Sequence, residues 1–306
     1  MKQFDKNGYK ISEMTLGTVQ LGMNYGINNK NGKPSAETAA KILETAESCG
    51  ITTFDTAAAY GDSENVLGEY FFKRNSKPTI VTKLHFDDIS KNELFDVLVK
   101  KAELSAKRLR VEKLPFLMLH NESYIKKYGA SIINALKKLK SEGFVENIGA
   151  SFSDKRELSS LCDAETFDCI QIPLNIFDNK EISDGSIEKL SEQGVSVFVR
   201  SVYLQGLFFM NANELPGKLL PAREPIEKLR RLSEEFGMTV GELALSFIRS
   251  AEGVSSIVLG CETAEQTRQN AEMFKKDKLS EEMKSKILEI ADGINPIVIR
   301  PWEWNL

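Results

Sequence analysis

The chain contains only four cysteines and two histidines among its 306 residues. The cysteines, Cys49, Cys162, Cys169 and Cys261, form no CxxC pair and match no other metal-ligand spacing. Four cysteines in a chain of this length also do not make a disulfide framework. We therefore expect reduced thiols, and the sequence gives no indication of a metal site.

The sequence also lacks basic clusters and long apolar runs. The formal net charge is −4, with acidic and basic residues interspersed, so we expect no nucleic-acid partner. Residues 1–6 lack an apolar signal core, and no stretch approaches the roughly 20 apolar residues of a membrane span. No low-complexity linker or composition break divides the chain. These absences predict one cytoplasmic domain spanning residues 1–306, with no nucleic-acid and no membrane partner.

Short β-rich segments alternate with helical patterns, which is typical of repeated βα units with parallel strands. The clearest helix follows Pro34 and Ser35, where Ser35 is the expected N-cap and Gly50 ends the helix. Its apolar residues recur at the spacing of one helix face. Further segments with a one-sided apolar pattern are residues 91–109, 131–142, 187–193 and 225–236.

The candidate strands are residues 14–18, 51–55, 79–83, 114–120, 145–151, 169–172, 195–200 and 255–259. Eight strands with helices between them predict an α/β fold in which the strands close into a (β/α)8 or TIM barrel. The main alternative is an open doubly wound sheet, which should carry a Gly-rich phosphate-binding turn after its first strand. Residues 16–22 match that turn poorly, so the barrel is favoured.

Four polar residues lie at strand ends or in the loops beyond them: Asp55, Tyr60, Lys83 and His120. In a parallel barrel these positions meet at one mouth, where the active sites of this fold are built. Taken singly, a strand-end histidine or an Asp–Lys pair is more often structural. Their common position favours a catalytic site.

The chemistry of these side chains suits carbonyl reduction. A phenol has a pKa near 10, so Tyr60 is a poor acid unless a nearby positive charge stabilises its phenolate. We expect Lys83 to supply that charge and Asp55 to hold Lys83 in place. His120 would hydrogen-bond a substrate oxygen.

Over residues 16–270 the chain resembles the aldo-keto reductases, NAD(P)H-dependent oxidoreductases built on a (β/α)8 barrel. The matching motifs occur in the family's order. They are FDTAAAYG at 54–61 with Ser63-Glu64 and Leu67-Gly68, Thr82-Lys83, Leu119-His120-Asn121, IGAS at 148–151, Gln171 with Asn175, LQGL at 204–207, and SSIVLG at 255–260 with Gln266 and Asn270.

The resemblance implies catalytic roles for Asp55, Tyr60, Lys83 and His120, with Tyr60 as proton donor, and a cofactor that is NADPH or NADH. It places the nicotinamide carboxamide at Ser151 and Gln171, the pyrophosphate at Ser201 and the 204–206 turn, and the adenosine near Gly260. The implied cofactor-binding residues are Gly17, Thr18, Ser151, Gln171, Arg200, Ser201, Leu204, Gln205, Gly206, Gly260, Glu262, Gln266 and Asn270.

Three residues depart from the family's usual pattern. Phe152 stands where many members have Asn, which removes a possible hydrogen bond to the carboxamide. Arg200 stands where an aromatic residue often stacks on the nicotinamide, and a guanidinium can stack or reach a negative substrate. Glu262 replaces a basic residue that binds the 2′-phosphate of NADPH in many members. We therefore expect weak discrimination against NADH.

The resemblance implies an aldehyde, ketone or sugar-derived substrate. Residues 22–29 and the tail 296–306, with Trp302 and Trp304, resemble a bacterial subset associated with surface-glycan biosynthesis. The tail residues would cover the barrel mouth or pack against the outside of a helix. Two alternatives stay open: a cofactor-binding sensory or scaffold barrel, as in potassium-channel β-subunits, and a redox-neutral sugar-modifying enzyme that recycles its nicotinamide. The complete catalytic set favours a reductase.

Overall fold

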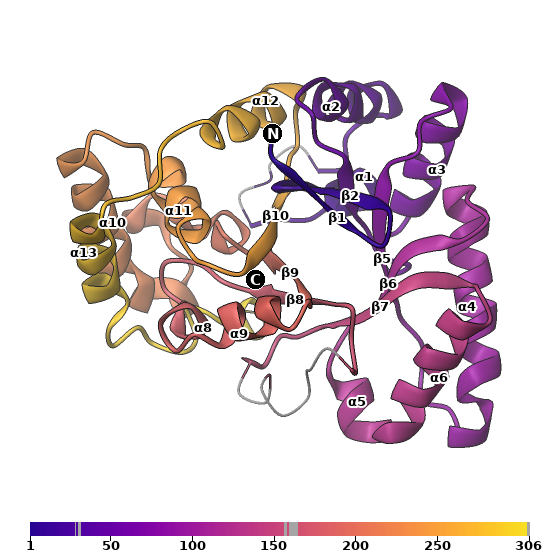
Figure 1. Ribbon diagram of the computed structural model, residues 1–306. Helices are drawn as coiled ribbons and strands as arrows, with labels where there is room; N and C mark the ends of the chain where they lie inside the picture. Colours follow the sequence, from indigo (N-terminus) through magenta and orange to yellow (C-terminus); the bar gives the residue numbers. More distant parts are fainter. Residues whose placement is uncertain (28, 30–31, 156–157, 159–164, 305–306) are drawn as a thin grey trace.

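The computed structural model describes residues 1–27, 29, 32–155, 158 and 165–304 (Figure 1). Eight parallel strands close into a barrel in the order β10-β3-β4-β5-β6-β7-β8-β9. The barrel strands are β3 (Met14–Gly17), β4 (Thr53–Asp55), β5 (Thr79–Leu84), β6 (Leu114–Leu119), β7 (Val145–Ser151), β8 (Cys169–Pro173), β9 (Ser196–Arg200) and β10 (Val254–Gly260). The predicted (β/α)8 barrel is confirmed, and the open-sheet alternative is excluded by the pairing of β10 with β3.

All eight predicted strands are present, with small differences at their ends. The largest difference is at β4, which begins at Thr53 rather than at residue 51. The backbone N–H of Ile51 donates to the carbonyl of Ala46 at 3.0 Å, so it still closes the end of the preceding helix instead of pairing in the sheet.

Helices cover the outside of the barrel (Figure 1). The predicted ones are present as α2 (Ala36–Ser48), α4 (Leu94–Leu109), α6 (Ala130–Ser141), α9 (Ser186–Glu192) and α10 (Arg223–Glu235). Ser35 caps α2 as expected, accepting a hydrogen bond from the N–H of Thr38. Among the residues described, the other helices are α1 (Val19–Gly22), α3 (Ser63–Arg74), α5 (Ser123–Tyr128), α8 (Lys180–Ser183), α11 (Val240–Arg249), α12 (Ala264–Met273) and α13 (Glu281–Ala291), together with short 3₁₀ segments that include Leu204–Phe209 and Pro301–Glu303.

An N-terminal hairpin, which the sequence reasoning missed, closes the bottom of the barrel. Strands β1 (Gln3–Lys6) and β2 (Tyr9–Ser12) pair around Asn7 and Gly8, and both of these residues have positive φ. That dipeptide is a strong signal for a two-residue hairpin turn and could have revealed it. The carbonyl of Lys10 accepts hydrogen bonds from the hydroxyls of Thr52 and Thr79 at the strand starts. The opposite mouth, at the carboxyl ends of the strands, stays open.

Three cysteines, Cys49, Cys169 and Cys261, are free thiols, and Cys162 lies outside the described residues. Within the part of the chain that the structure describes, none of the helices has the length and apolar character needed to cross a membrane.

Candidate active site

A cavity of about 890 Å³ opens at the carboxyl ends of the barrel strands. Every residue that the sequence assigned to the site lines this cavity except Lys83, which lies just beneath it and is almost fully buried. Strand register explains much of this convergence, since Gly17 pairs with both Asp55 and Gly260, and Ser151 pairs with Gln171. Closure of the barrel therefore gathers residues that are far apart in sequence.

Asp55 and Lys83 form a buried ion pair at the floor of the cavity. The Lys83 ammonium donates to both carboxylate oxygens of Asp55, at 2.7 and 2.6 Å, and to the carbonyl of Thr56 at 3.0 Å. The amide of Gln171 donates to Asp55 Oδ2 at 2.7 Å. Burial lowers the pKa of Lys83, and the Asp55 carboxylate opposes that shift. These contacts leave the Gln171 side-chain oxygen as the acceptor that can face a ligand.

Tyr60 lies above this pair, in the loop that leads from β4 into α3. Its ring centroid is 5.1 Å from the Lys83 nitrogen. Burial, and then the negative charge of Asp55, raise the pKa of Tyr60, while Arg200 lowers it. The structure thus does not show the lowering by Lys83 that we expected, because Asp55 neutralises the lysine. Tyr60 is protonated throughout the neutral pH range and can act as a proton donor.

His120 lies beside Tyr60, at the end of β6. The two rings meet edge to face, with 5.5 Å between their centroids. Burial first, and then the positive charges of Lys83, His85 and Arg200, lower the pKa of His120 to about 3. His120 is therefore a neutral imidazole that can hydrogen-bond a carbonyl oxygen, and it is not a protonated acid at neutral pH.

The loop after β9 has an unusual backbone. Ser201, Leu204 and Gln205 have φ values of 63°, 49° and 55°, and Gly206 has 93°. Left-handed conformations cost free energy in residues other than glycine and concentrate at functional sites. Runs of this kind can direct backbone N–H groups toward an anion. The turn lines the cavity where the resemblance implies the pyrophosphate.

The start of α12 borders the far end of the cavity. Thr263 caps this helix, and the side-chain oxygen of Gln266 accepts from the N–H of Glu262 at 2.7 Å. Asn270 is fixed by two contacts: it accepts a hydrogen bond from the Tyr203 hydroxyl at 3.2 Å and donates to the Cys261 sulfur at 3.3 Å. The predicted adenosine residues thus form a pre-organised polar wall.

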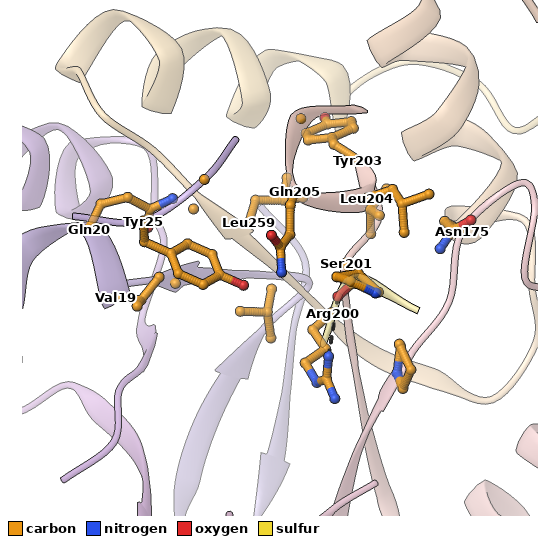
Figure 2. Close-up of a pocket in the computed structure, with 18 of the residues that line it drawn as sticks. Val19, Gln20, Tyr25, Asn175, Arg200, Ser201, Tyr203, Leu204, Gln205 and Leu259 are labelled. Atoms are coloured by element: carbon orange, nitrogen blue, oxygen red, sulfur yellow. Dashed lines mark hydrogen bonds between the residues drawn. The ribbon is translucent and has the colours of Figure 1, made fainter. Parts of the chain in front are cut away.

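Several lining residues were not assigned to the site from sequence. They include residues of the loop after β3, of the start of α11 and of the tail. Figure 2 shows Tyr25 with its hydroxyl directed toward the side chain of Gln205 on the opposite loop. In the tail, Trp302 lines the mouth, whereas Trp304 is buried and donates to the carbonyl of Ile297, another tail residue. The position of Tyr25 just after a barrel strand was a usable signal.

The cavity fits a dinucleotide such as NAD(P)H. Its volume lies in the upper part of the range of about 300–1,000 Å³ typical of ligand sites. Hydroxyl and amide side chains stand near Tyr60, a left-handed turn follows β9, and a helix N-terminus lies beyond. A Cβ on Gly260 would lie only 2.5 Å from the Gln20 side-chain nitrogen, so a larger residue there would require the Gln20 side chain to move.

A comparison with protein-family models decides the family. The model of the aldo/keto reductase family matches residues 13–292. This chain belongs to the aldo/keto reductase family. It is therefore an oxidoreductase that acts on carbonyl or CH–OH groups with NAD(P).

Individual relatives of this aldo/keto reductase are distant. The NADH-specific methylglyoxal reductase of Escherichia coli (strain K12) is 25% identical over 293 residues, covering 85% of this chain and 89% of the relative. An aldo-keto reductase from Bacillus halodurans in its holo form superimposes with a TM-score of 0.76 at 22% identity, covering 95% and 96% of the two chains. A glycerol dehydrogenase from Gluconobacter oxydans gives 0.74 at 22% identity, covering 96% of each. At this identity the structural likeness shows the fold alone.

Proposed function

We propose that this aldo/keto reductase reduces an aldehyde or ketone, with Tyr60 as the proton donor and NADH as the preferred cofactor. The observation that supports this most is the grouping of a protonated Tyr60, a neutral His120 and the Asp55–Lys83 pair at one end of the cavity. A sugar-derived carbonyl compound belongs to the same substrate class and would enter by the same mouth.

Each side chain of the site has its own role in carbonyl reduction. Bound NADH would supply the hydride. Tyr60 donates its proton to the substrate oxygen as negative charge develops there, and His120 hydrogen-bonds the same oxygen. Asp55 and Lys83 form the floor beneath Tyr60. Ser151 and Gln171 would orient the nicotinamide through its carboxamide.

The preference for NADH is supported by the charges near α12. Glu262 lines the cavity just after β10, and its burial raises its pKa. The nearby cations are already paired: Arg268 with Glu265 at 2.9 Å, Lys275 with Glu272 at 2.7 Å, and Lys276 with Glu242. A 2′-phosphate would therefore meet a carboxylate instead of a basic group. The name of the E. coli relative also states NADH specificity.

The decisive experiment removes one oxygen atom. Tyr60→Phe keeps the ring and deletes the proton donor, so kcat/KM across a panel of small aldehydes, ketones and sugars should fall by at least about 10²-fold. NADH binding, followed by fluorescence, and the unfolding midpoint should stay close to wild type. Tyr70→Phe, which deletes a hydroxyl bonded to Glu47 away from the cavity, is the matched control. Near-wild-type turnover in Tyr60→Phe would refute the role of Tyr60.

A further inference from the structure

Arg200 is the one Lys or Arg side chain among the described residues that line the cavity. It lies at the end of β9 and is partly buried. Its guanidinium donates to the carbonyl of Phe152 at 3.2 Å, to the Ser153 hydroxyl at 3.0 Å and to the Ser201 hydroxyl at 3.3 Å. All three acceptors are uncharged, and Arg200 forms no ion pair with any carboxylate in the described part of the chain. Its positive charge is therefore uncompensated by direct contact.

The other charged groups around the cavity do not neutralise Arg200. Asp55 is paired with Lys83, and Glu262 lies beside the start of α12. Asp178, which also feels the charge of Arg200, is bound by Lys155 at 2.7 Å. The space next to Arg200 thus has a positive charge for which this chain provides no direct counter-ion among its described residues.

This charge is close to the reacting end of the cavity. The positive charge of Arg200 opposes the rise that burial causes in the pKa of Tyr60 and Tyr25, and adds to the lowering that burial causes in the pKa of His120. Tyr60, His120 and Arg200 line the same cavity, so a substrate whose carbonyl hydrogen-bonds Tyr60 and His120 has room to extend a substituent toward Arg200. Figure 2 shows the guanidinium below Ser201, joined to it by a hydrogen bond.

The guanidinium is also held in place from behind. The buried carboxylate of Glu122 accepts hydrogen bonds from the backbone N–H groups of Ser153 and Asp154, both at 3.0 Å. These bonds fix the loop whose Phe152 carbonyl and Ser153 hydroxyl orient Arg200. A cation pre-organised in this way loses little conformational entropy when an anion binds it.

We propose that Arg200 binds a carboxylate of the substrate, so that the preferred substrates of this reductase are oxo acids rather than neutral carbonyl compounds. The inference rests on the proposed function, since it places the carbonyl at Tyr60. A planar guanidinium matches the two oxygens of a carboxylate. A neutral substrate would displace water from Arg200 without replacing its hydrogen bonds, whereas an oxo acid would restore them.

Binding tests this inference independently of turnover. Oxamate is an oxo-acid mimic that cannot be reduced in this reaction, and methyl oxamate is its neutral ester. Each is titrated into the NADH complex while NADH fluorescence is followed. Wild-type protein should bind oxamate at least tenfold more tightly than methyl oxamate. Arg200→Gln should bring that ratio close to one, and Arg200→Lys should lower it by less, because it keeps the charge and loses the planar fork.

Kinetics extends the test to substrates. Two pairs of substrates are compared: pyruvate with methyl pyruvate, and succinic semialdehyde with its methyl ester. In Arg200→Gln, the ratio of kcat/KM for the acid to kcat/KM for the ester should fall in both pairs. A wild-type protein that binds oxamate no more tightly than methyl oxamate would overturn the inference. So would an unchanged ratio in Arg200→Gln accompanied by a rise in the NADH dissociation constant, which would assign Arg200 to the cofactor's phosphates. Tight oxamate binding without reduction of any carbonyl would keep the anion site and reject the proposed function.

Glu122→Gln tests the support behind Arg200. An amide has one oxygen to offer the two backbone N–H groups, so the loop should loosen and the oxamate preference should fall. In the Arg200→Gln background the same substitution should leave the ratio of oxamate to methyl oxamate affinity unaltered, because its effect passes through Arg200. A further independent fall in that ratio would show that Glu122 does not act as a positioning residue for Arg200.

Discussion

The Lys83 ammonium donates to both carboxylate oxygens of Asp55, to Oδ1 at 2.7 Å and to Oδ2 at 2.6 Å, and both side chains are almost fully buried. An isolated charge at such a site would be costly, whereas the pair neutralises itself. The third donor of Lys83 is taken by the carbonyl of Thr56. This pair is therefore as much a structural element of the barrel floor as a catalytic one.

Lys83→Met should destabilise the fold as well as impair catalysis. It leaves Asp55 as a buried carboxylate without its counter-ion, a situation that typically costs about 3–5 kcal/mol of unfolding free energy. The double variant Lys83→Met with Asp55→Asn should recover part of that loss, because the amide carries no charge. Denaturant unfolding of the three proteins measures the effect. A loss below about 1 kcal/mol in the single variant would contradict a mutually neutralised pair.

The pH dependence of stability should reveal His120. Its folded pKa, about 3, lies below the ordinary value of 6.5. The unfolded chain therefore binds a proton between these values while the folded protein resists it. The stabilisation is present above pH 6.5 and is lost as the pH falls toward 3. At pH 5 the free energy of unfolding should already have fallen by about 2 kcal/mol. Between pH 8 and pH 5, the free energy of unfolding of His120→Gln should therefore fall by less than that of wild type.

The second histidine gives the control for that measurement. His85 is exposed, and its charge is only a secondary cause of the lowered His120 pKa, so His85→Gln should change the difference between pH 8 and pH 5 much less than His120→Gln does. Equal pH dependence in His120→Gln and wild type would mean that the imidazole is not held in its neutral form by the fold.

Glu262→Arg should shift the cofactor preference toward NADPH. At an effective dielectric of about 20, a carboxylate about 5 Å from one phosphate charge costs on the order of 3 kcal/mol before screening. Fluorescence titration with both nucleotides should show that wild type does not prefer NADPH, and that the variant gains at least about tenfold in relative NADPH affinity. Glu265 is in the first turn of α12 but does not line the cavity, so Glu265→Arg should gain much less relative NADPH affinity. A wild-type NADPH dissociation constant tenfold or more below that of NADH would refute the assignment.

Gly22→Ala should disturb Tyr60 through the backbone. A Cβ at Gly22 would lie 1.7 Å from the Tyr60 carbonyl oxygen and 2.7 Å from the Ser63 nitrogen. Because both neighbours are backbone atoms, the loop carrying Tyr60 must move, with a loss of more than about 2 kcal/mol in stability and a fall in turnover. Gly217→Ala, where a Cβ meets nothing within 4 Å, is the matched control. Wild-type stability and turnover in Gly22→Ala would show that the loop can adapt freely.

The sequence alone predicted the barrel because each of its units is encoded locally. Apolar runs mark the eight strands, the helix after Ser35 has both its cap and its periodic apolar face, and polar residues stand at strand ends. The N-terminal hairpin was missed although Asn7-Gly8 signals its turn. The site residues that the family resemblance implied line the cavity, apart from Lys83, which lies just beneath it.

Tertiary structure decided the contacts between those residues. Gln171 donates to Asp55 across 116 positions of sequence, and Glu122 fixes the loop that orients Arg200. The direction of the pKa shift of Tyr60 also came from the fold, since burial and Asp55 raise this pKa by more than Arg200 lowers it. Local sequence sets strands, helices and turns because their hydrogen bonds link near neighbours. Desolvation and ion pairing depend on which distant side chains meet when the barrel closes, and only the three-dimensional arrangement determines that.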